Sequence, residues 1–249
     1  IWGGEDIHIG LYDRGPDIRK ASRRTVDHMA VRAGKLLGKR VLDLGSGYGG
    51  AARVLAGEHG ALVTCLNLSA VENQRNRALT HEAGLKDRID VIDGSFDSVP
   101  FESAVFDLVW SQDAILHAPD RCAVLDEVAR LLRPSGDFIF TDPMQADALD
   151  DNQALQPIYD RIHLPDLASF DFYRRELAKR HFNEVSVEDL TGHMRTHYAR
   201  IAEELDARRD ELASVDVFVD RMLTGLRHWV SGAEGGLLAW GIMHFRKAA

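Results

Sequence analysis

The stretch that most constrains the fold of this chain is residues 40–50, with the sequence RVLDLGSGYGG. Val41, Leu42 and Leu44 form a short apolar run that is typical of a buried parallel strand. The glycines that follow allow a sharp turn and let a ligand approach the backbone, because no Cβ stands in the way. The first free N–H groups of the next helix would face that ligand. The stretch therefore predicts a strand, a binding turn and a helix.

The spacing of the glycines does not identify the ligand, because Gly45, Gly47 and Gly50 also match the pattern of dinucleotide sites. Asp43 favours S-adenosylmethionine (SAM) over NAD. A buried carboxylate is costly unless something pairs with it, and the amino end of SAM is such a partner. Dinucleotide-binding strands usually have an apolar residue at that place. A glycine turn without any binding function is the third interpretation.

Downstream of the turn, strand-like and helix-like segments alternate, which predicts βαβ units and a parallel sheet. The expected strands are 41–44, 61–68, 89–92, 106–110, 138–141, 185–190 and 237–245, and the expected helices are 17–37, 49–59, 70–83, 119–132 and 170–182. Residues 133–136 are predicted to be a turn and 147–166 a polar surface insertion. Ligands of such sheets bind beyond the carboxyl ends of the strands, so the candidate loops begin near Gly45, Asn67, Asp93, Ser111 and Asp142.

Two helical stripes follow this region, and both are expected to pack into the core rather than to line a site. The first consists of Met194, Tyr198, Ile201 and Leu205, and the second of Phe218, Met222, Leu226 and Trp229.

The composition of the 249-residue chain excludes several classes of function. Its net charge of −9 and scattered basic residues argue against a broad nucleic-acid surface. The two cysteines, Cys65 and Cys122, are not spaced as in a disulfide framework or a zinc site. We therefore expect no bound metal and a protein that works in a reducing compartment. No apolar run approaches the ~20 residues of a membrane span, and no signal-peptide pattern is present. We expect a cytoplasmic monomer or homodimer with a small-molecule substrate.

Polar residues at three strand ends are candidates for ligand contacts. Asn67 stands where an NAD site requires an acid, and Glu72, one helical turn later, could bind the ribose hydroxyls instead or remain solvated. Residues 93–96 suit a planar base, although Asp93 is also an ordinary strand-end turn residue. His117 lies in one of the converging loops, whereas a lone histidine is more often structural.

The chain resembles the class I SAM-dependent methyltransferases, and more closely the sarcosine/dimethylglycine N-methyltransferases that make glycine betaine. The segments similar to that family are 1–12 (IWGGEDIHIGLY), 45–50 (GSGYGG), 109–113 (VWSQD), 140–147 (FTDPMQAD), 160–164 (DRIHL) and 240–247 (WGIMHFRK). The glycine turn identifies only the superfamily, whereas 1–12 and 140–147 are far more specific.

This resemblance implies an α/β, Rossmann-like fold with a seven-stranded sheet, an antiparallel last strand and a helical lid insertion. A single methyltransferase domain, 1–249, would then comprise a SAM-binding core of about 17–145 plus strands 185–190 and 237–245, an N-terminal flap 1–16 and a substrate lid of about 146–235. The cofactor would be SAM and its product S-adenosylhomocysteine. The implied cofactor-binding residues are His8, Ile9, Asp43, Gly45, Gly47, Asn67, Leu68, Glu72, Ser95, Phe96 and Gln112. Related methyltransferases commonly have Gln in place of Glu72.

The reaction that the resemblance implies is an in-line methyl transfer to an amine, in which positioning supplies most of the rate. His117 would orient the substrate or accept its proton, with Gln112 as the second catalytic residue, and Arg161 would hold the carboxylate in two places. The expected substrate-binding residues are Trp2, Tyr12, Trp110, His117, Met144, Arg161 and His163. Alternatives are another small-molecule O- or C-methyltransferase, a non-catalytic SAM-binding regulator and an NAD-dependent oxidoreductase.

Overall fold

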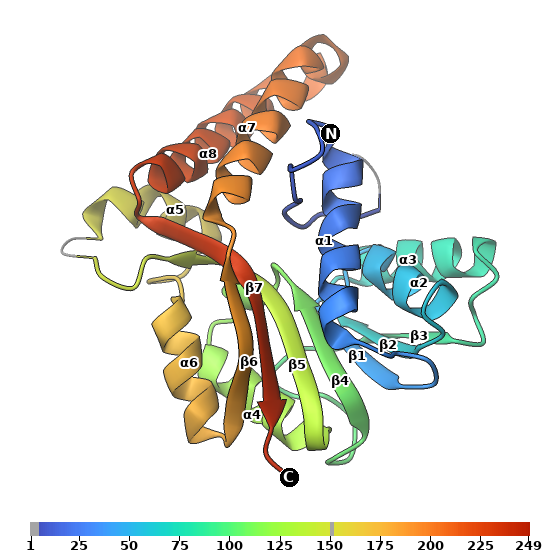
Figure 1. The fold of residues 1–249 in the computed structure, drawn as a ribbon. Helices are drawn as coiled ribbons and strands as arrows, with labels where there is room; N and C mark the ends of the chain where they lie inside the picture. Colours follow the sequence, from blue (N-terminus) through green and yellow to red (C-terminus); the bar gives the residue numbers. More distant parts are fainter. Residues whose placement is uncertain (1–4, 150–151) are drawn as a thin grey trace.

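The computed structural model describes residues 5–149 and 152–249, which form a mixed sheet with helices on both faces (Figure 1). The seven strands follow the order β3-β2-β1-β4-β5-β7-β6. They are β1 (Arg40–Leu44), β2 (Leu62–Asn67), β3 (Ile89–Asp93), β4 (Phe106–Gln112), β5 (Leu132–Gln145), β6 (Phe182–Asp189) and β7 (Leu238–Lys247). The pairs from β3 to β5 are parallel, and β7 is antiparallel to both β5 and β6. The predicted Rossmann-like fold with an antiparallel last strand is confirmed.

The helices form two groups. Five flank the sheet, namely α1 (Ile18–Ala33), α2 (Gly50–Gly57), α3 (Ala70–Glu82), α4 (Arg121–Leu131) and α6 (Phe170–Lys179). Three others stand beyond the carboxyl ends of the parallel strands, namely α5 (Gln156–Ile162), α7 (Thr191–Ala207) and α8 (Asp216–Glu234) (Figure 1). The short helices are η1 (Ile115–His117), η2 (Gln153–Leu155) and η3 (Arg209–Val215). The second group therefore occupies the place of a lid over the ligand-binding edge of the sheet.

Strand residues alternate between two cores, as the period of a pleated strand requires. In β1, Val41 is buried in the cluster that includes α1 and α2, and Leu42 in the cluster that includes α4 and α6. The helices begin where the sequence offers a capping side chain. Asp17, Ser69 and Asp120 each accept a hydrogen bond from a backbone N–H of the first turn, which satisfies one otherwise free donor.

The region around β5 differs from the sequence prediction. Residues 133–136 are not a separate turn but the start of β5, where Ser135 has a φ of 63° and the register with β4 shifts. The strand also continues past residue 141 to Gln145, because it pairs with β7 from Asp137 opposite Arg246 to Gln145 opposite Leu238. That long antiparallel pairing joins segments about a hundred residues apart, which a local pattern does not reveal.

Two further predictions about the lid are corrected. The stretch 147–166 is not only a polar surface insertion, because it contains η2 and α5, in which Ile158 and Tyr159 are buried. Phe218 was expected to pack into the core with the other residues of its helical stripe, but 62% of its surface is exposed.

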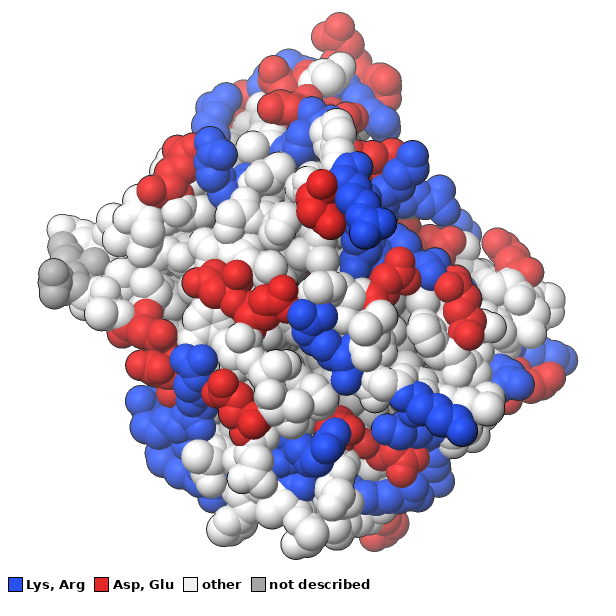
Figure 2. Space-filling model, in the orientation of Figure 1, with Lys and Arg blue, Asp and Glu red and all other residues white. Residues whose placement is uncertain are grey.

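Acidic and basic side chains are interspersed over the face shown in Figure 2, without a continuous basic stripe. Among the described residues, no helix has the length and apolar character needed to span a membrane.

Candidate active site

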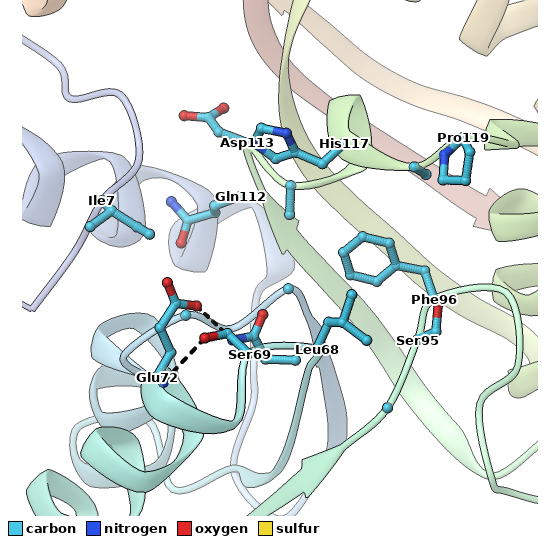
Figure 3. A pocket seen from close by; sticks show the side chains of 16 residues that line it. Ile7, Leu68, Ser69, Glu72, Ser95, Phe96, Gln112, Asp113, His117 and Pro119 are labelled. Carbon is cyan, nitrogen blue, oxygen red and sulfur yellow. Dashed lines mark hydrogen bonds between the residues drawn. The ribbon is translucent and has the colours of Figure 1, made fainter. Parts of the chain in front are cut away.

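A cavity of about 440 Å³ lies at the carboxyl ends of the parallel strands, and we call it the turn cavity (Figure 3). Its walls come from the glycine turn, the ends of β2 and β4, and the segment after β3. The lining residues are Ile7, Gly45, Gly47, Asn67, Leu68, Ser69, Glu72, Gly94, Ser95, Phe96, Gln112, Asp113, Ala114, His117, Ala118 and Pro119. Most of the residues that the sequence assigned to a cofactor therefore surround one space.

The glycine turn has the backbone conformation that its sequence predicts. Gly45 and Gly47 have φ values of 76° and 50°, in the left-handed region that favours glycine. A Cβ on Gly45 would lie 2.3 Å from the Cβ of Ala114, so even alanine would collide there. The N–H of Gly45 donates to the carbonyl of Leu66 over 2.8 Å, which holds the turn against the end of β2.

The residues after β2 and β3 take different roles. The Asn67 amide donates to a Glu72 carboxylate oxygen over 2.8 Å, and both residues line the turn cavity, where they form one polar wall. Asp93 instead accepts hydrogen bonds from Asn73 over 2.7 Å and from Arg77 over 2.8 Å, and does not line the cavity. Asp93 therefore fixes the strand end structurally and leaves the cavity wall to the residues that follow it.

Asp43 is almost completely buried below the glycine turn, where a small space of about 30 Å³ separates it from the N-terminal segment. Burial raises the pKa of this carboxyl to about 7, although the nearby His8 lowers it. His8 is also buried, and its Nε2 lies 3.6 Å from the Asp6 carboxylate. His8 and Arg53 offset the cost of burying Asp43 only in part, and a cationic ligand group would relieve the rest.

The side-chain amide of Gln112 uses its oxygen in a hydrogen bond within the protein, while its nitrogen has no partner among the described residues. Its Oε1 accepts a hydrogen bond from the indole N–H of Trp110 over 3.0 Å. Its Nε2 is buried and has no partner among the residues that the structure describes. Because Gln112 lines the turn cavity, this donor is available to a ligand there.

Asp113 fastens the N-terminal segment over the turn, a role that sequence reasoning missed. One carboxylate oxygen accepts the backbone N–H of Ile9 over 2.6 Å, and the other accepts the indole N–H of Trp240 over 2.8 Å. Burial raises the pKa of Asp113, and these hydrogen bonds oppose the shift. Asp113 belongs to the VWSQD segment that resembles the family, but the sequence could not reveal its partner Ile9, which is 104 residues away.

A second cavity of about 600 Å³ lies between the N-terminal segment, η1 and the three lid helices, and we call it the lid cavity. Its lining residues are Ile7, Ile9, Tyr48, Asp113, Leu116, His117, Pro143, Arg161, Ile162, Tyr198, Met222, Leu226 and Trp229. The rings of Tyr198 and Trp229 stack with their centroids 5.1 Å apart, at an interplanar angle of 25°. The lid cavity thus combines aromatic faces and apolar side chains with the guanidinium of Arg161, the carboxyl of Asp113 and the imidazole of His117.

The two cavities share Ile7, Asp113 and His117 as lining residues, so they meet at the end of β4. Desolvation by the surrounding protein lowers the pKa of His117, an effect that Asp113 opposes. His117 is therefore mainly neutral at pH 7 and can accept or donate a hydrogen bond where the two cavities join.

Several expected substrate residues lie elsewhere. Trp110 and Met144 are fully buried in the two cores of the sheet and line neither cavity, because each lies before the end of its strand and packs among core side chains. Tyr12 does not line either cavity, since its hydroxyl and the Nδ1 of His197 lie 2.8 Å apart in a hydrogen bond. His163 lies in an outer groove between α5 and α8, and Trp2 lies outside the described residues.

The aromatic walls were missed because a helical stripe has the same pattern whether it faces a core or a cavity. Tyr198 and Trp229 belong to the two stripes predicted as core packing, and Met222 and Leu226 also line the lid cavity.

Among the described residues, no group of three or more His, Cys, Asp or Glu side chains is arranged to hold a metal ion.

Comparisons with known proteins agree on the class of enzyme. A family model described as a methyltransferase domain matches residues 42–140. The sarcosine/dimethylglycine N-methyltransferase of Halorhodospira halochloris is 50% identical over 252 residues, covering 99% of this chain and 90% of that protein. The glycine/sarcosine/dimethylglycine N-methyltransferase of Actinopolyspora halophila is also 50% identical over 99% of this chain, which spans 44% of that longer protein.

A solved structure is similar over the whole chain. It comes from Galdieria sulphuraria, is provisionally assigned as a sarcosine dimethylglycine methyltransferase, and superposes with a TM-score of 0.94 at 42% identity. The match covers 100% of this chain and 94% of the other. These relatives do not support the dinucleotide alternative that the glycine spacing left open.

Proposed function

The chain belongs to the sarcosine/dimethylglycine N-methyltransferase family of SAM-dependent enzymes, and on that premise we propose that it methylates the nitrogen of sarcosine and of dimethylglycine. The products would be dimethylglycine and glycine betaine. The observation that supports this most is the meeting of the turn cavity and the lid cavity at His117. A methyl donor in one cavity and an amine in the other would approach each other in line.

The turn cavity fits SAM together with the small space beside Asp43, which shares Gly45, Gly47 and Gln112 with it. When bound, SAM supplies a methyl group on a positively charged sulfur. We assign Asp43 and the backbone near His8 to the amino-acid end of the cofactor, and Glu72 to the ribose hydroxyls. The Nε2 of Gln112, which has no partner among the described residues, and the Asp43 carboxyl, whose pKa burial raises, are the two features that a bound ligand would satisfy.

The adenine end is assigned to the opposite wall of the turn cavity. Ser95 and Phe96 line it from the segment after β3, and Leu68 lines it from the end of β2. An aromatic ring and a leucine side chain offer the flat apolar contact that a purine base needs. Gly45, Gly47 and Asn67 remain proposed contacts by their place in the same lining.

The acceptor is assigned to the lid cavity, where two features match an amino acid with a methylated nitrogen. The stacked rings of Tyr198 and Trp229 offer faces for an alkylammonium group, worth roughly 0.5–2 kcal/mol. Arg161 forms no ion pair with any described residue, so its guanidinium is free to bind a carboxylate with two hydrogen bonds. These two groups would fix the two ends of the substrate.

The chain's own residues then have three tasks in the reaction. The acceptor enters as an ammonium, whose pKa in water is about 10, and it must lose its proton before its nitrogen can attack. The apolar part of the lid cavity lowers that pKa and so favours release of the proton to solvent before the transfer. Neutral His117 would orient the amine toward the turn cavity. Asp113 holds the N-terminal segment in place through Ile9, which limits the access of water to the junction.

Incubation with labelled SAM and a panel of glycine, sarcosine, dimethylglycine and a phenol tests this proposal. Labelled dimethylglycine and glycine betaine are the expected products. Methylation of the phenol in preference to the amines would favour an O-methyltransferase, and SAM binding without transfer to any acceptor would favour a regulator. In the same assay, an unchanged pH–rate profile in His117→Ala would exclude a general-base role. The monomeric or dimeric state and the cytoplasmic location stay predictions.

A further inference from the structure

Gly225 stands in the middle of α8, a place where alanine is the better helix former. Its φ lies outside the left-handed region, so the backbone does not require glycine there. A Cβ on Gly225 would lie 2.7 Å from both Cζ and Nε of Arg161 and 2.8 Å from its Nη1. The guanidinium of Arg161 therefore occupies the space that a side chain at position 225 would fill.

Among the residues that the structure describes, only neutral groups bind the guanidinium in this space beside Gly225, which we call the notch. Nη1 of Arg161 donates to the carbonyl of Arg221 over 3.3 Å, and Nη2 lies 2.8 Å from the Sδ of Met222. Both partners belong to α8, in the helical turn before Gly225. Arg161 has no carboxylate partner among the residues that the structure describes, so its positive charge is held in place without being neutralised.

The notch also determines the position of the Arg161 guanidinium relative to the lid cavity. Arg161 lines the lid cavity together with Met222 and Leu226, and it lines the outer groove between α5 and α8 together with His163. It comes from α5, whereas Tyr198 and Trp229 come from α7 and α8. A shift of the guanidinium out of the notch would change its distance from the aromatic pair, and a small zwitterion has to reach both.

We propose that Gly225 is a positioning residue for substrate recognition, because its missing side chain seats the Arg161 guanidinium where it binds the carboxylate of the amino-acid acceptor. This inference rests on the proposed function. Since the clash is with the flexible end of a long side chain, Gly225→Ala is expected to displace Arg161 and leave the fold intact. Substrate specificity then depends on a glycine that touches no substrate atom.

Steady-state kinetics of Gly225→Ala test the role. We expect the KM for sarcosine and for dimethylglycine to rise at least about tenfold, the order expected for loss of a charge-assisted hydrogen bond, while kcat changes less and the Kd for SAM stays the same. Gly192→Ala is the matched control, since Gly192 is also helical and a Cβ there would meet nothing within 4 Å. It should leave all three constants unchanged.

A double variant separates an effect through Arg161 from a general disturbance of α8. In an Arg161→Ala background, Gly225→Ala should raise KM little further, because the side chain it displaces is gone. A full additional increase in that background would overturn the positioning role, as would an unchanged KM in the single variant. Wild-type protein that methylates neither amine would instead overturn the proposed function and, with it, this role.

Discussion

The replacement Asp43→Asn tests how the buried carboxyl below the glycine turn contributes to cofactor binding. Asp43 has a pKa of about 7 in the free protein because burial disfavours its charge. If only the ionised form pairs with the cofactor ammonium, about nine-tenths of the protein is competent at pH 8 and about one-tenth at pH 6. The affinity of the wild-type protein for SAM should therefore fall about tenfold between those pH values.

The variant removes both the charge and its titration. At pH 8, loss of a charge-assisted hydrogen bond, worth about 1.5–3 kcal/mol, should weaken SAM binding by at least about tenfold. The affinity of Asp43→Asn should then lose the pH dependence that belongs to position 43. The amino group of SAM titrates identically with both proteins, so the difference between the two pH profiles isolates Asp43. His8, Asp6 and Arg53 also act on this carboxyl, and all three remain in the variant.

Isothermal titration calorimetry with SAM at pH 6, 7 and 8 measures these affinities. Repeating the pH 6 titration in buffers of different ionisation enthalpy counts protons, and the wild-type protein should release about 0.9 proton more than the variant. Because the folded-state pKa lies above the unfolded value, the unliganded wild-type protein should also gain stability relative to the variant as the pH falls from above 7 toward 4. Parallel pH profiles for the two proteins would refute the assignment of Asp43.

Three further predictions concern the flap, the turn and the lid. Asp113→Asn can accept only one of the two N–H groups that the carboxylate accepts, so urea unfolding should show a loss of about 1.5–3 kcal/mol; a loss below about 0.5 kcal/mol would contradict its fastening role. Gly45→Ala would collide with Ala114 and should abolish measurable SAM binding. The control Gly84→Ala has a similar φ but open space around it, so it should lose about 1 kcal/mol of stability and bind SAM as the wild type does. Equal effects of the two variants on SAM binding would argue against the collision. Trp229→Leu should raise the KM for dimethylglycine roughly 2- to 30-fold with an unchanged Kd for SAM, and an unaltered KM would remove the indole from the acceptor site.

The local signals in the sequence were sufficient for the parallel strands and the turn, whereas the antiparallel last strand was expected only from the family resemblance. The apolar run, the glycines and Asp43 lie within eleven neighbouring residues, 40–50, so no distant contact is needed to interpret them. The alternation of strands and helices then placed the other candidate loops at the same edge of the sheet. Most of the proposed cofactor residues therefore line one cavity in the structure.

The acceptor side could not be obtained in the same way, because it depends on contacts between distant segments. Asp113 meets Ile9 across 104 residues, and the aromatic pair is assembled from α7 and α8. Trp110 is the instructive error. It lies on the same face of β4 as Gln112, so the strand period does not separate the two residues, and Trp110 is buried in the core because it lies two residues before the end of the strand.

The most direct test of the account is the identity of the products formed from sarcosine. The protein is incubated with sarcosine and SAM that bears a trideuterated methyl group, and the products are analysed by mass spectrometry. We predict dimethylglycine with one labelled methyl group and, later, glycine betaine with two. Unlabelled sarcosine recovered after incubation with a protein that binds SAM would contradict the claim that the two cavities bring donor and amine together.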